Sequence, residues 1–201
     1  MTGTPHLRAR HWIEYAATLA VLAISVMSLW VAIGTEDANR KMVAASSWPF
    51  LQMQLNNLDQ QAHERIDFYI LNAGVGPAKI ESFQLFWKGT PYTSALVYLH
   101  DCCGLDIALH EKQKFLPNVS PIITGASAGL VLRAGEARSV LSVPLGPDNG
   151  PLWHALDKAR AQTTFRACYC SVFDECWLSN LEGLKPKSID KCPVATRNFP
   201  S

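Results

Sequence analysis

The hydrophobic pattern divides the chain into two parts that follow different periods. Residues Tyr15 to Thr35 run for 21 positions without a formal charge. A helix of about 20 apolar residues spans the roughly 30 Å hydrocarbon core of a bilayer. We therefore predict a transmembrane helix over residues 12–35, which contacts the lipid bilayer and follows a short cytoplasmic N-terminus at residues 1–11.

A cleaved signal peptide is the nearest alternative, because Arg8 and Arg10 form a basic region before the run. Signal sequences contain about 7 to 15 apolar residues, whereas this run is longer and carries bulky Trp30 near its end. A buried core helix would need a polar face, and only three hydroxyl side chains interrupt the run. The pattern favours an uncleaved signal-anchor.

The segment directly after the apolar run is polar but still suited to a helix. Residues 36–47 are rich in helix formers, which predicts a helical linker. Trp48-Pro49 comes next, and a residue before proline is pushed out of the α region. We therefore place an extracytoplasmic domain at residues 48–201.

Within this domain, apolar and polar residues alternate with the period of two that is typical of strands. Glycine-bearing turns separate these segments. The predicted strands are residues 50–55, 65–71, 79–88, 130–133, 139–145, 163–173 and 176–179. Such a series predicts a mainly β fold, specifically an antiparallel Ig-like β-sandwich.

Two stretches depart from this alternation. Residues 93–103 and 151–162 have helical patterns, and the second opens with proline at its first turn. We expect them to be the one or two short helices of the domain. Residues 105–127 show neither period, and their length is typical of a functional loop or a lid over the core.

All six cysteines follow the apolar run and form an even set, which predicts a disulfide framework in an oxidising compartment. They are Cys102, Cys103, Cys168, Cys170, Cys176 and Cys192. A hairpin over residues 165–180 would place Cys170 opposite Cys176, so we expect that bridge. A bridge between neighbours would close a strained ring, so we expect Cys102 and Cys103 to pair with Cys168 and Cys192.

The orientation of the anchor follows from two arguments. Arg8 and Arg10 are matched by Arg40 and Lys41, but the short N-terminal segment has no acidic residue before Glu14, which favours its cytoplasmic placement. Disulfides persist outside the cytoplasm, so the cysteines favour the same topology. We predict a single-pass protein of the inner (plasma) membrane with a periplasmic C-terminal domain.

Cys168, Cys170 and Cys176 suggest an alternative role, a thiol redox or metal-binding (copper or zinc) site, because two of these thiols share one face of a strand. The paired C-x2–4-C spacing of zinc sites is absent from the sequence. We therefore predict no bound metal and no cofactor, and keep this site as the alternative.

The sequence contains few residue patterns that indicate catalysis. Cys102 or Cys103 with His100 or His110 has the residue types of a nucleophile and its base, but disulfide cysteines beside surface histidines are the simpler interpretation. Residues 42–201 contain 14 Lys and Arg and 14 Asp and Glu, which is no footprint for nucleic acid. We predict no catalytic residues.

Three sequence motifs together resemble a known class of proteins. They are Asn72-x-Gly74-x-Gly76-Pro77-Ala78, Leu132-Arg133-Ala134-Gly135-Glu136 and Tyr169-Cys170-Ser171-Val172-Phe173-x-x-Cys176-Trp177. Together they resemble uncharacterised bacterial single-pass membrane proteins with an Ig-like periplasmic domain. The resemblance implies an anchored envelope protein and transfers no catalytic residue. We expect a protein-binding or accessory subunit whose partner is a membrane protein or a second copy of the chain.

Overall fold

The computed structural model describes residues 6–59, 61–92, 94–114, 116, 119–183 and 185–193, without the side chains of residues 6–11. These residues form two compact units, one ending at Ala45 and the other beginning at Ser46. Each unit is described by itself.

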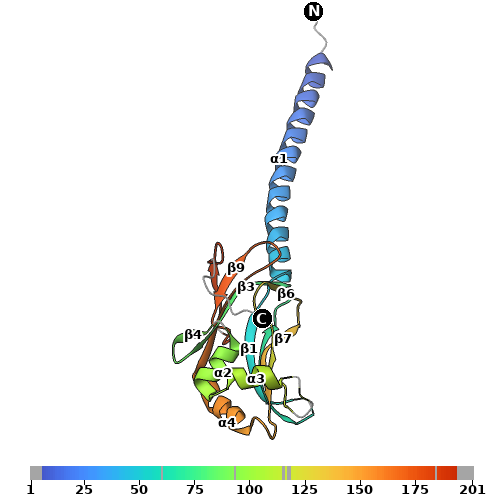
Figure 1. The fold of residues 1–201 in the computed structure, drawn as a ribbon. Helices are drawn as coiled ribbons and strands as arrows, with labels where there is room; N and C mark the ends of the chain where they lie inside the picture. Colours follow the sequence, from blue (N-terminus) through green and yellow to red (C-terminus); the bar gives the residue numbers. More distant parts are fainter. Residues whose placement is uncertain are drawn as a thin grey trace, which may run out of the picture. The chain divides into compact units, whose positions relative to one another are not determined.

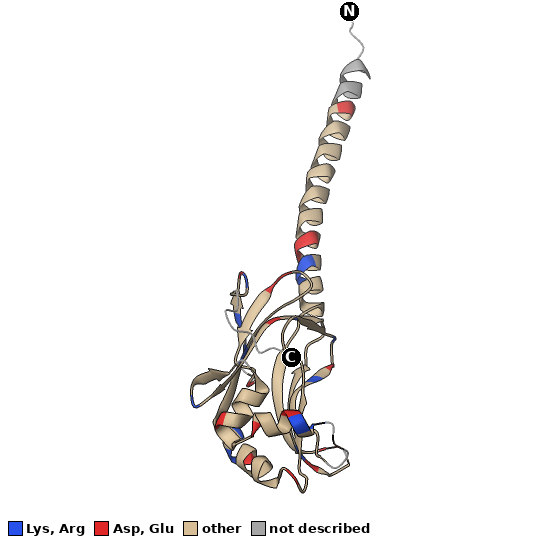
Figure 2. Cartoon of the chain, viewed as in Figure 1, with Lys and Arg blue, Asp and Glu red and all other residues tan. Residues whose placement is uncertain are grey.

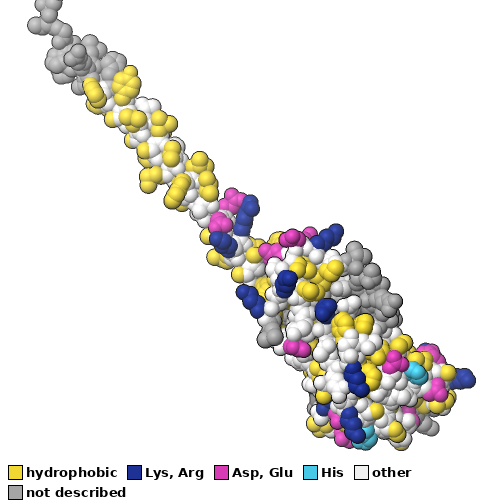
Figure 3. Space-filling view, turned by 90° about the vertical axis from the view of Figure 1, so that its left-hand side faces the viewer, with side chains coloured by type: hydrophobic (Ala, Val, Ile, Leu, Met, Phe, Trp, Pro, Cys, Tyr) yellow, Lys and Arg dark blue, Asp and Glu magenta, His cyan; other side chains and the backbone are white. Residues whose placement is uncertain are grey.

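The first unit is a single helix, α1 (His6–Ser46), of 41 residues. Its large apolar side chains are exposed all around, and Trp30 is 81% exposed (Figure 3). The hydroxyls of Thr18, Ser25 and Ser28 donate to carbonyls four residues earlier, so these polar groups are satisfied within the helix. The helix is long and apolar enough to cross a membrane, although a signal sequence would pass the same test.

Between Glu14 and Glu36 the helix carries no charged residue, and charged positions return where the apolar stretch ends (Figure 2). Arg40 pairs with Glu36, and Lys41 pairs with Asp37 at 2.8 Å, both one helical turn apart and exposed. Such pairs support a helix in water. The last quarter of α1 therefore has the composition of a solvated helix, not of a membrane span.

The second unit contains two antiparallel sheets (Figure 1). The first has the order β1-β2-β7-β5 and consists of β1 (Leu51–Leu58), β2 (Glu64–Asn72), β7 (Ala137–Pro144) and β5 (Ile123–Thr124). The second has the order β10-β9-β8-β3-β4, with β6 paired to the start of β3. Its strands are β10 (Lys187–Ile189), β9 (Cys176–Ser179), β8 (Thr163–Cys170), β3 (Ala78–Trp87), β4 (Thr90–Tyr92) and β6 (Leu130–Leu132).

The strand predictions are confirmed at all seven segments, with β8 ending at Cys170 instead of Phe173. The short strands β4, β5 and β10 were not expected, because two or three residues carry too little alternation to be recognised. The expectation of a mainly β fold holds for the second unit only. In the part of the chain that the structure describes, α1 raises helix to about 36% against about 33% strand.

The core lies between the two sheets. In β2, Ile66, Phe68 and Ile70 are fully buried while the residues between them face the other side. Phe68 meets Phe165 of the second sheet edge to face, with ring centroids 5.6 Å apart. Burying each such side chain contributes about 1.5–3 kcal/mol to folding. The alternate apolar residues that the sequence shows in β2 therefore hold the two sheets together.

Three helices complete this unit: α2 (Ala95–Cys103), α3 (Ile107–Gln113) and α4 (Gly150–Ala159), the last continuing as a 3-10 turn, Arg160–Gln162. The two predicted helices, α2 and α4, are confirmed and pack on each other. Tyr98 of α2 is fully buried and its hydroxyl lies 2.9 Å from Thr163 Oγ1. Burial raises the pKa of Tyr98 to about 12, so this phenol stays neutral and keeps its proton in that contact.

The described part of residues 105–127 contains a helix and a strand, where the sequence predicted a loop or a lid. The helix is α3, whose first turn is capped by the Asp106 carboxylate accepting from Leu109 N at 2.9 Å, and the strand is the edge strand β5. Seven-residue helices show too few turns for a period to be read from sequence.

One buried side chain, Asn72, joins three segments at the end of β2. Its Oδ1 accepts from the backbone N–H groups of Phe50 (3.2 Å) and Gly74 (3.1 Å). Its Nδ2 donates to the carbonyls of Gly76 (2.8 Å) and Leu132 (3.1 Å). Because Asn72 is fully buried, no water competes for these four bonds.

The glycines of the Asn72 turn allow the start of the domain to lie against it. A Cβ at Gly76 would overlap the backbone of Ser47, and one at Gly74 would overlap the backbone of Phe50. Val75 N donates to the Trp48 carbonyl at 3.0 Å. These glycines therefore serve close backbone approach in a turn.

Asn72→Asp tests this junction. The carboxylate keeps the acceptors but has no donor for the carbonyls of Gly76 and Leu132, so the free energy of unfolding should fall by about 3 kcal/mol or more. The loss should shrink at low pH, where a protonated Asp regains one donor. Urea denaturation of the detergent-solubilised chain, followed by tryptophan fluorescence, measures both effects.

The matched control is Asn57→Asp, at an exposed asparagine of β1, which should change the unfolding free energy by less than about 0.5 kcal/mol. Equal losses at the two positions would show that Asn72 has no special role.

Candidate functional site

The hairpin formed by β8 and β9 brings Cys168, Cys170 and Cys176 close together. Cys168 and Cys170 are two residues apart on β8 and therefore share one face. Cys170 is directly opposite Cys176 in the register, with Cα atoms 4.0 Å apart, and the two form a disulfide. This is the bridge expected from the sequence.

The other two disulfides differ from the expectation. Cys168 is bonded to Cys192, with Cα atoms 5.8 Å apart, and Cys102 is bonded to its neighbour Cys103. The prediction that Cys102 and Cys103 take Cys168 and Cys192 is therefore wrong in this structure.

The reason is the length of β8. Tyr98 of α2 contacts Thr163 at the first residue of β8, whereas Cys168 and Cys170 lie at its other end. The five residues of strand from Thr163 to Cys168 span about 17 Å, and a disulfide needs Cα atoms within about 7 Å. Cys102 and Cys103 at the end of α2 are therefore too far from Cys168 to bond with it, and they bond with each other.

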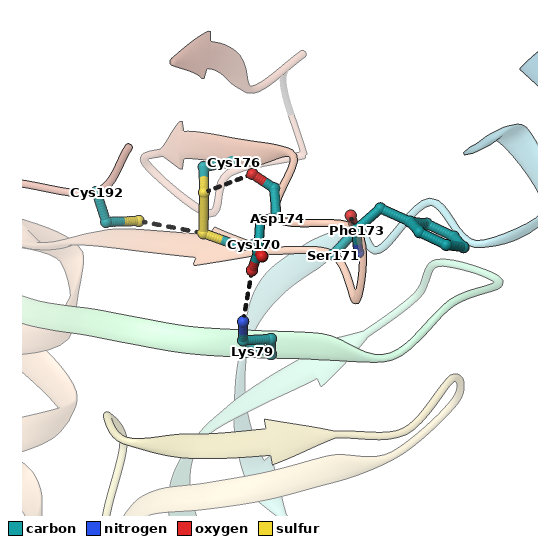
Figure 4. A network of polar contacts seen from close by, with 7 residues as sticks. All are labelled: Lys79, Cys170, Ser171, Phe173, Asp174, Cys176 and Cys192. Atoms are coloured by element: carbon teal, nitrogen blue, oxygen red, sulfur yellow. Dashed lines mark hydrogen bonds and ion pairs between the residues drawn. A yellow bond between two sulfur atoms is a disulfide. The ribbon is translucent and has the colours of Figure 1, made fainter. Parts of the chain in front are cut away.

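Four cysteines from two disulfides form one cluster, which we call the cysteine cluster: Cys168, Cys170, Cys176 and Cys192. The Sγ atoms of Cys170 and Cys192 are 3.7 Å apart although these residues are not bonded to each other (Figure 4). The sulfurs of Cys170, Cys176 and Cys192 all lie within 4.8 Å of one another. Two bridges therefore share one site.

Cys192 is the member that sequence reasoning missed as a partner of this site. It comes after β10, where Ile189 pairs with Cys176. That pairing returns the chain to the hairpin and sets Cys192 beside Cys170. A three-residue strand gives no periodic signal, so only the even cysteine count pointed to Cys192.

A salt bridge and a cavity border the cluster. Lys79 Nζ lies 2.7 Å from the Asp174 carboxylate at the hairpin turn, which lowers the pKa of Asp174 and raises that of Lys79 (Figure 4). Both groups are substantially exposed, so water screens this pair. An open cavity of about 420 Å³ adjoins the cluster; it is lined by Glu81, Cys170, Asp174, Cys176, Asp190, Lys191 and Cys192.

The nucleophile interpretation of Cys102 and Cys103 has no support in the geometry. Both sulfurs are in a disulfide, and His100 Nδ1 lies 2.8 Å from the Leu105 carbonyl oxygen. Asp174 and Glu175 lie in the connection between β8 and β9, and Asp174 pairs with Lys79.

A second site, a polar groove on the outer face of β1-β2-β7-β5, was not expected. The register aligns Asn56, Asp67 and Ser142 in one row across the sheet, and Tyr69 with Ser139 in the next. The groove has a volume of about 480 Å³ and is lined by Asn56, Leu58, Asp59, Gln61, Arg65, Asp67, Tyr69, Ile123, Ala137, Ser139 and Ser142.

Three polar atoms of this groove are buried without a hydrogen-bond partner: Arg65 Nε, Ser139 Oγ and Ser142 Oγ. Ser142 is only 3% exposed. Buried polar groups are nearly always bonded, and leaving one unpaired costs about 1–3 kcal/mol. The alternation of β2 predicted which of its residues face outward. Their position beside Ser139 and Ser142 depends on the pairing of β2 with β7, two strands that are some 70 residues apart in sequence.

No family model matches the chain, and neither the curated proteins nor the solved structures contain a significant match.

Tryptic mapping of the non-reduced protein separates the two sets of bridges. The structure predicts that peptide 89–112, which holds Cys102 and Cys103, is released alone and lighter by two hydrogens. Peptides 167–187 and 192–197 should stay joined through Cys168 and Cys192. Recovery of 89–112 linked to 167–187 or to 192–197 would restore the pairing expected from sequence.

Proposed function

We propose that this chain is a single-pass inner-membrane protein, held by α1 as an uncleaved anchor, whose disulfide-stabilised Ig-like domain lies in the periplasm and binds another protein as an accessory subunit. The exposed apolar surface of α1 supports the anchor. Three disulfides support an oxidising compartment, and the acid-free N-terminal segment supports the orientation.

The strand orders support the Ig-like assignment. In immunoglobulin constant domains the strands A-B-E-D form one sheet and C-F-G the other. The order β1-β2-β7-β5 has the same connectivity as A-B-E-D, and β9-β8-β3 has that of G-F-C. Domains of this class commonly display binding surfaces on a rigid scaffold.

The polar groove is the observation that carries the binding role. Its unpaired Arg65 Nε and the hydroxyls of Ser139 and Ser142 are donors and acceptors that a partner can satisfy. Arg65 and the two carboxylates Asp59 and Asp67 give it both signs of charge. A protein surface offering backbone and polar side-chain groups meets this mixture better than a simple anion would.

The anchor narrows the choice of partner. The helix continues for 11 residues beyond Thr35 to Ser46, which is about 17 Å at 1.5 Å per residue. The domain is thus tethered close to the bilayer, and a membrane protein or a second copy of the chain is the expected partner.

Cell fractionation tests the anchor and its orientation. The protein should remain in the membrane after alkaline carbonate extraction, keep residues 1–11 by mass spectrometry, and lose its domain when intact spheroplasts are treated with protease. A mature chain that begins after α1, or a domain protected from protease in intact spheroplasts, contradicts the proposal.

Site-specific photocrosslinking in native membranes tests the groove. A benzoylphenylalanine at Ala137, an exposed residue of the groove, should give a discrete adduct. Arg65→Ala should reduce its yield about tenfold, since a hydrogen bond to a charged group contributes about 1.5–3 kcal/mol.

Two controls use the outer face of the other sheet. The same probe at Thr164 should give no adduct, and Arg166→Ala should leave the Ala137 adduct unchanged, because both residues are exposed on β8. An adduct that forms equally from Thr164, or that survives Arg65→Ala, removes the groove as the binding surface.

A second candidate function is thiol redox or metal binding at the cysteine cluster. The observation that favours it is the 3.7 Å separation of the Cys170 and Cys192 sulfurs, which belong to different disulfides. A dithiol reductant that opens the Cys168–Cys192 bridge would become a disulfide itself and leave a thiolate at Cys192. That thiolate would be in position to attack Cys170 and release Cys176 as a thiolate, an exchange that keeps the number of disulfides unchanged.

A further inference from the structure

We propose that, once its two disulfides are reduced, the cysteine cluster binds one thiophilic metal ion of the Zn²⁺ type, with Cys168, Cys170, Cys176 and Cys192 as the four ligands. This inference rests on the second candidate function and adds Cys192 as the ligand that completes the site. It is independent of the groove and of the protein partner.

The sulfur positions fit a tetrahedral thiolate site. Zn–S bonds of about 2.3 Å place the sulfurs of such a site about 3.8 Å apart. The sulfurs of Cys170 and Cys192 are already 3.7 Å apart, and that of Cys176 lies within 4.8 Å of both. The Cys168 sulfur is outside this close group but is bonded to that of Cys192, so reduction frees it to move into the fourth position.

Backbone pairing, not the disulfides, holds three of these residues. Cys168 and Cys170 pair with Leu178 and Cys176 in the ladder between β8 and β9. Cys192 is held less directly, three residues after β10 pairs with β9. The hairpin therefore keeps Cys170 opposite Cys176 after reduction, with Cys168 two residues away on the same strand. The segment bearing Cys192 can adjust to close the tetrahedron.

The donors and their surroundings select the kind of ion. Sulfur ligands alone favour Zn²⁺ or Cu(I) over Mg²⁺ and Ca²⁺, which require oxygen. The tetrahedral spacing favours Zn²⁺. Three carboxylates, Glu81, Asp174 and Asp190, and one ammonium group, Lys191, line the adjoining cavity of about 420 Å³. Lys79 pairs with Asp174, so the cavity keeps a modest negative charge and offers a cation an entry path.

The chemistry balances through a dithiol reductant. Two equivalents of dithiol transfer four electrons and four protons to the disulfides Cys168–Cys192 and Cys170–Cys176, giving four thiols and two oxidised dithiols. The metal ion then displaces the four thiol protons as it binds four thiolates. Because each sulfur bonds either to sulfur or to metal, the oxidised and metal-bound forms exclude each other.

Cobalt titration of the reduced, detergent-solubilised full-length protein tests this under anaerobic conditions. Co²⁺ should bind at one ion per chain with the intense visible bands of tetrahedral thiolate coordination, and Zn²⁺ should displace it. Cys192→Ser should weaken binding at least as much as the roughly 10–100-fold caused by outer-shell changes at metal sites. The oxidised protein should bind none.

The vicinal pair supplies the matched control. The double variant Cys102→Ser and Cys103→Ser also removes two cysteines, but from α2, and should retain the full cobalt spectrum. A spectrum that persists in Cys192→Ser and disappears in this double variant overturns the proposal, as does a folded, reduced wild-type chain that binds no Co²⁺.

Far-UV circular dichroism covers the case in which reduction unfolds the domain. Zn²⁺ should then restore the native spectrum of the wild-type chain and of the Cys102 and Cys103 double variant, but not that of Cys192→Ser. A reduced chain that Zn²⁺ cannot refold refutes the site. Neither result bears on crosslinking at the groove, so the two proposals fail separately.

Discussion

The four hydrogen bonds of the Asn72 side chain are the interaction on which the second unit depends. They join the first extended residues of the domain, the turn between β2 and β3, and the end of β6. Asn72 also uses its backbone, donating to Glu136 and accepting from Gly135. A single residue thus fixes where β1 begins, where the chain crosses to the second sheet, and where β7 starts.

That junction determines both candidate sites. With β2 held at Asn72, its outward residues Arg65, Asp67 and Tyr69 align with β1 and β7 to form the groove. The turn after Asn72 leads into β3, whose first residues pair with the end of β8, where Lys79 is opposite Cys170. The cysteine cluster is therefore positioned from the same point as the groove, on the other sheet.

The two sites differ in what they contribute to stability. The groove leaves Ser142 Oγ and two other buried polar atoms unpaired, which costs free energy in the isolated protein. The bridge from Cys168 to Cys192 instead restricts the unfolded chain, a contribution of about 3.5 kcal/mol in the chain-entropy model. The groove therefore lowers the stability of the domain, and the bridge raises it.

The sequence by itself determined the features that depend on local patterns: the apolar run of α1, seven of the strands, α2 and α4, and the bridge Cys170–Cys176 across one hairpin. Each is set by residues within a few positions of one another. Tertiary structure alone decided the bridge from Cys168 to Cys192, the pairing of Cys102 with Cys103, and the polar groove. These rest on the distance between the two ends of β8 and on the register of β2 against β7, quantities that pairing between distant segments fixes and that no local pattern of residues records.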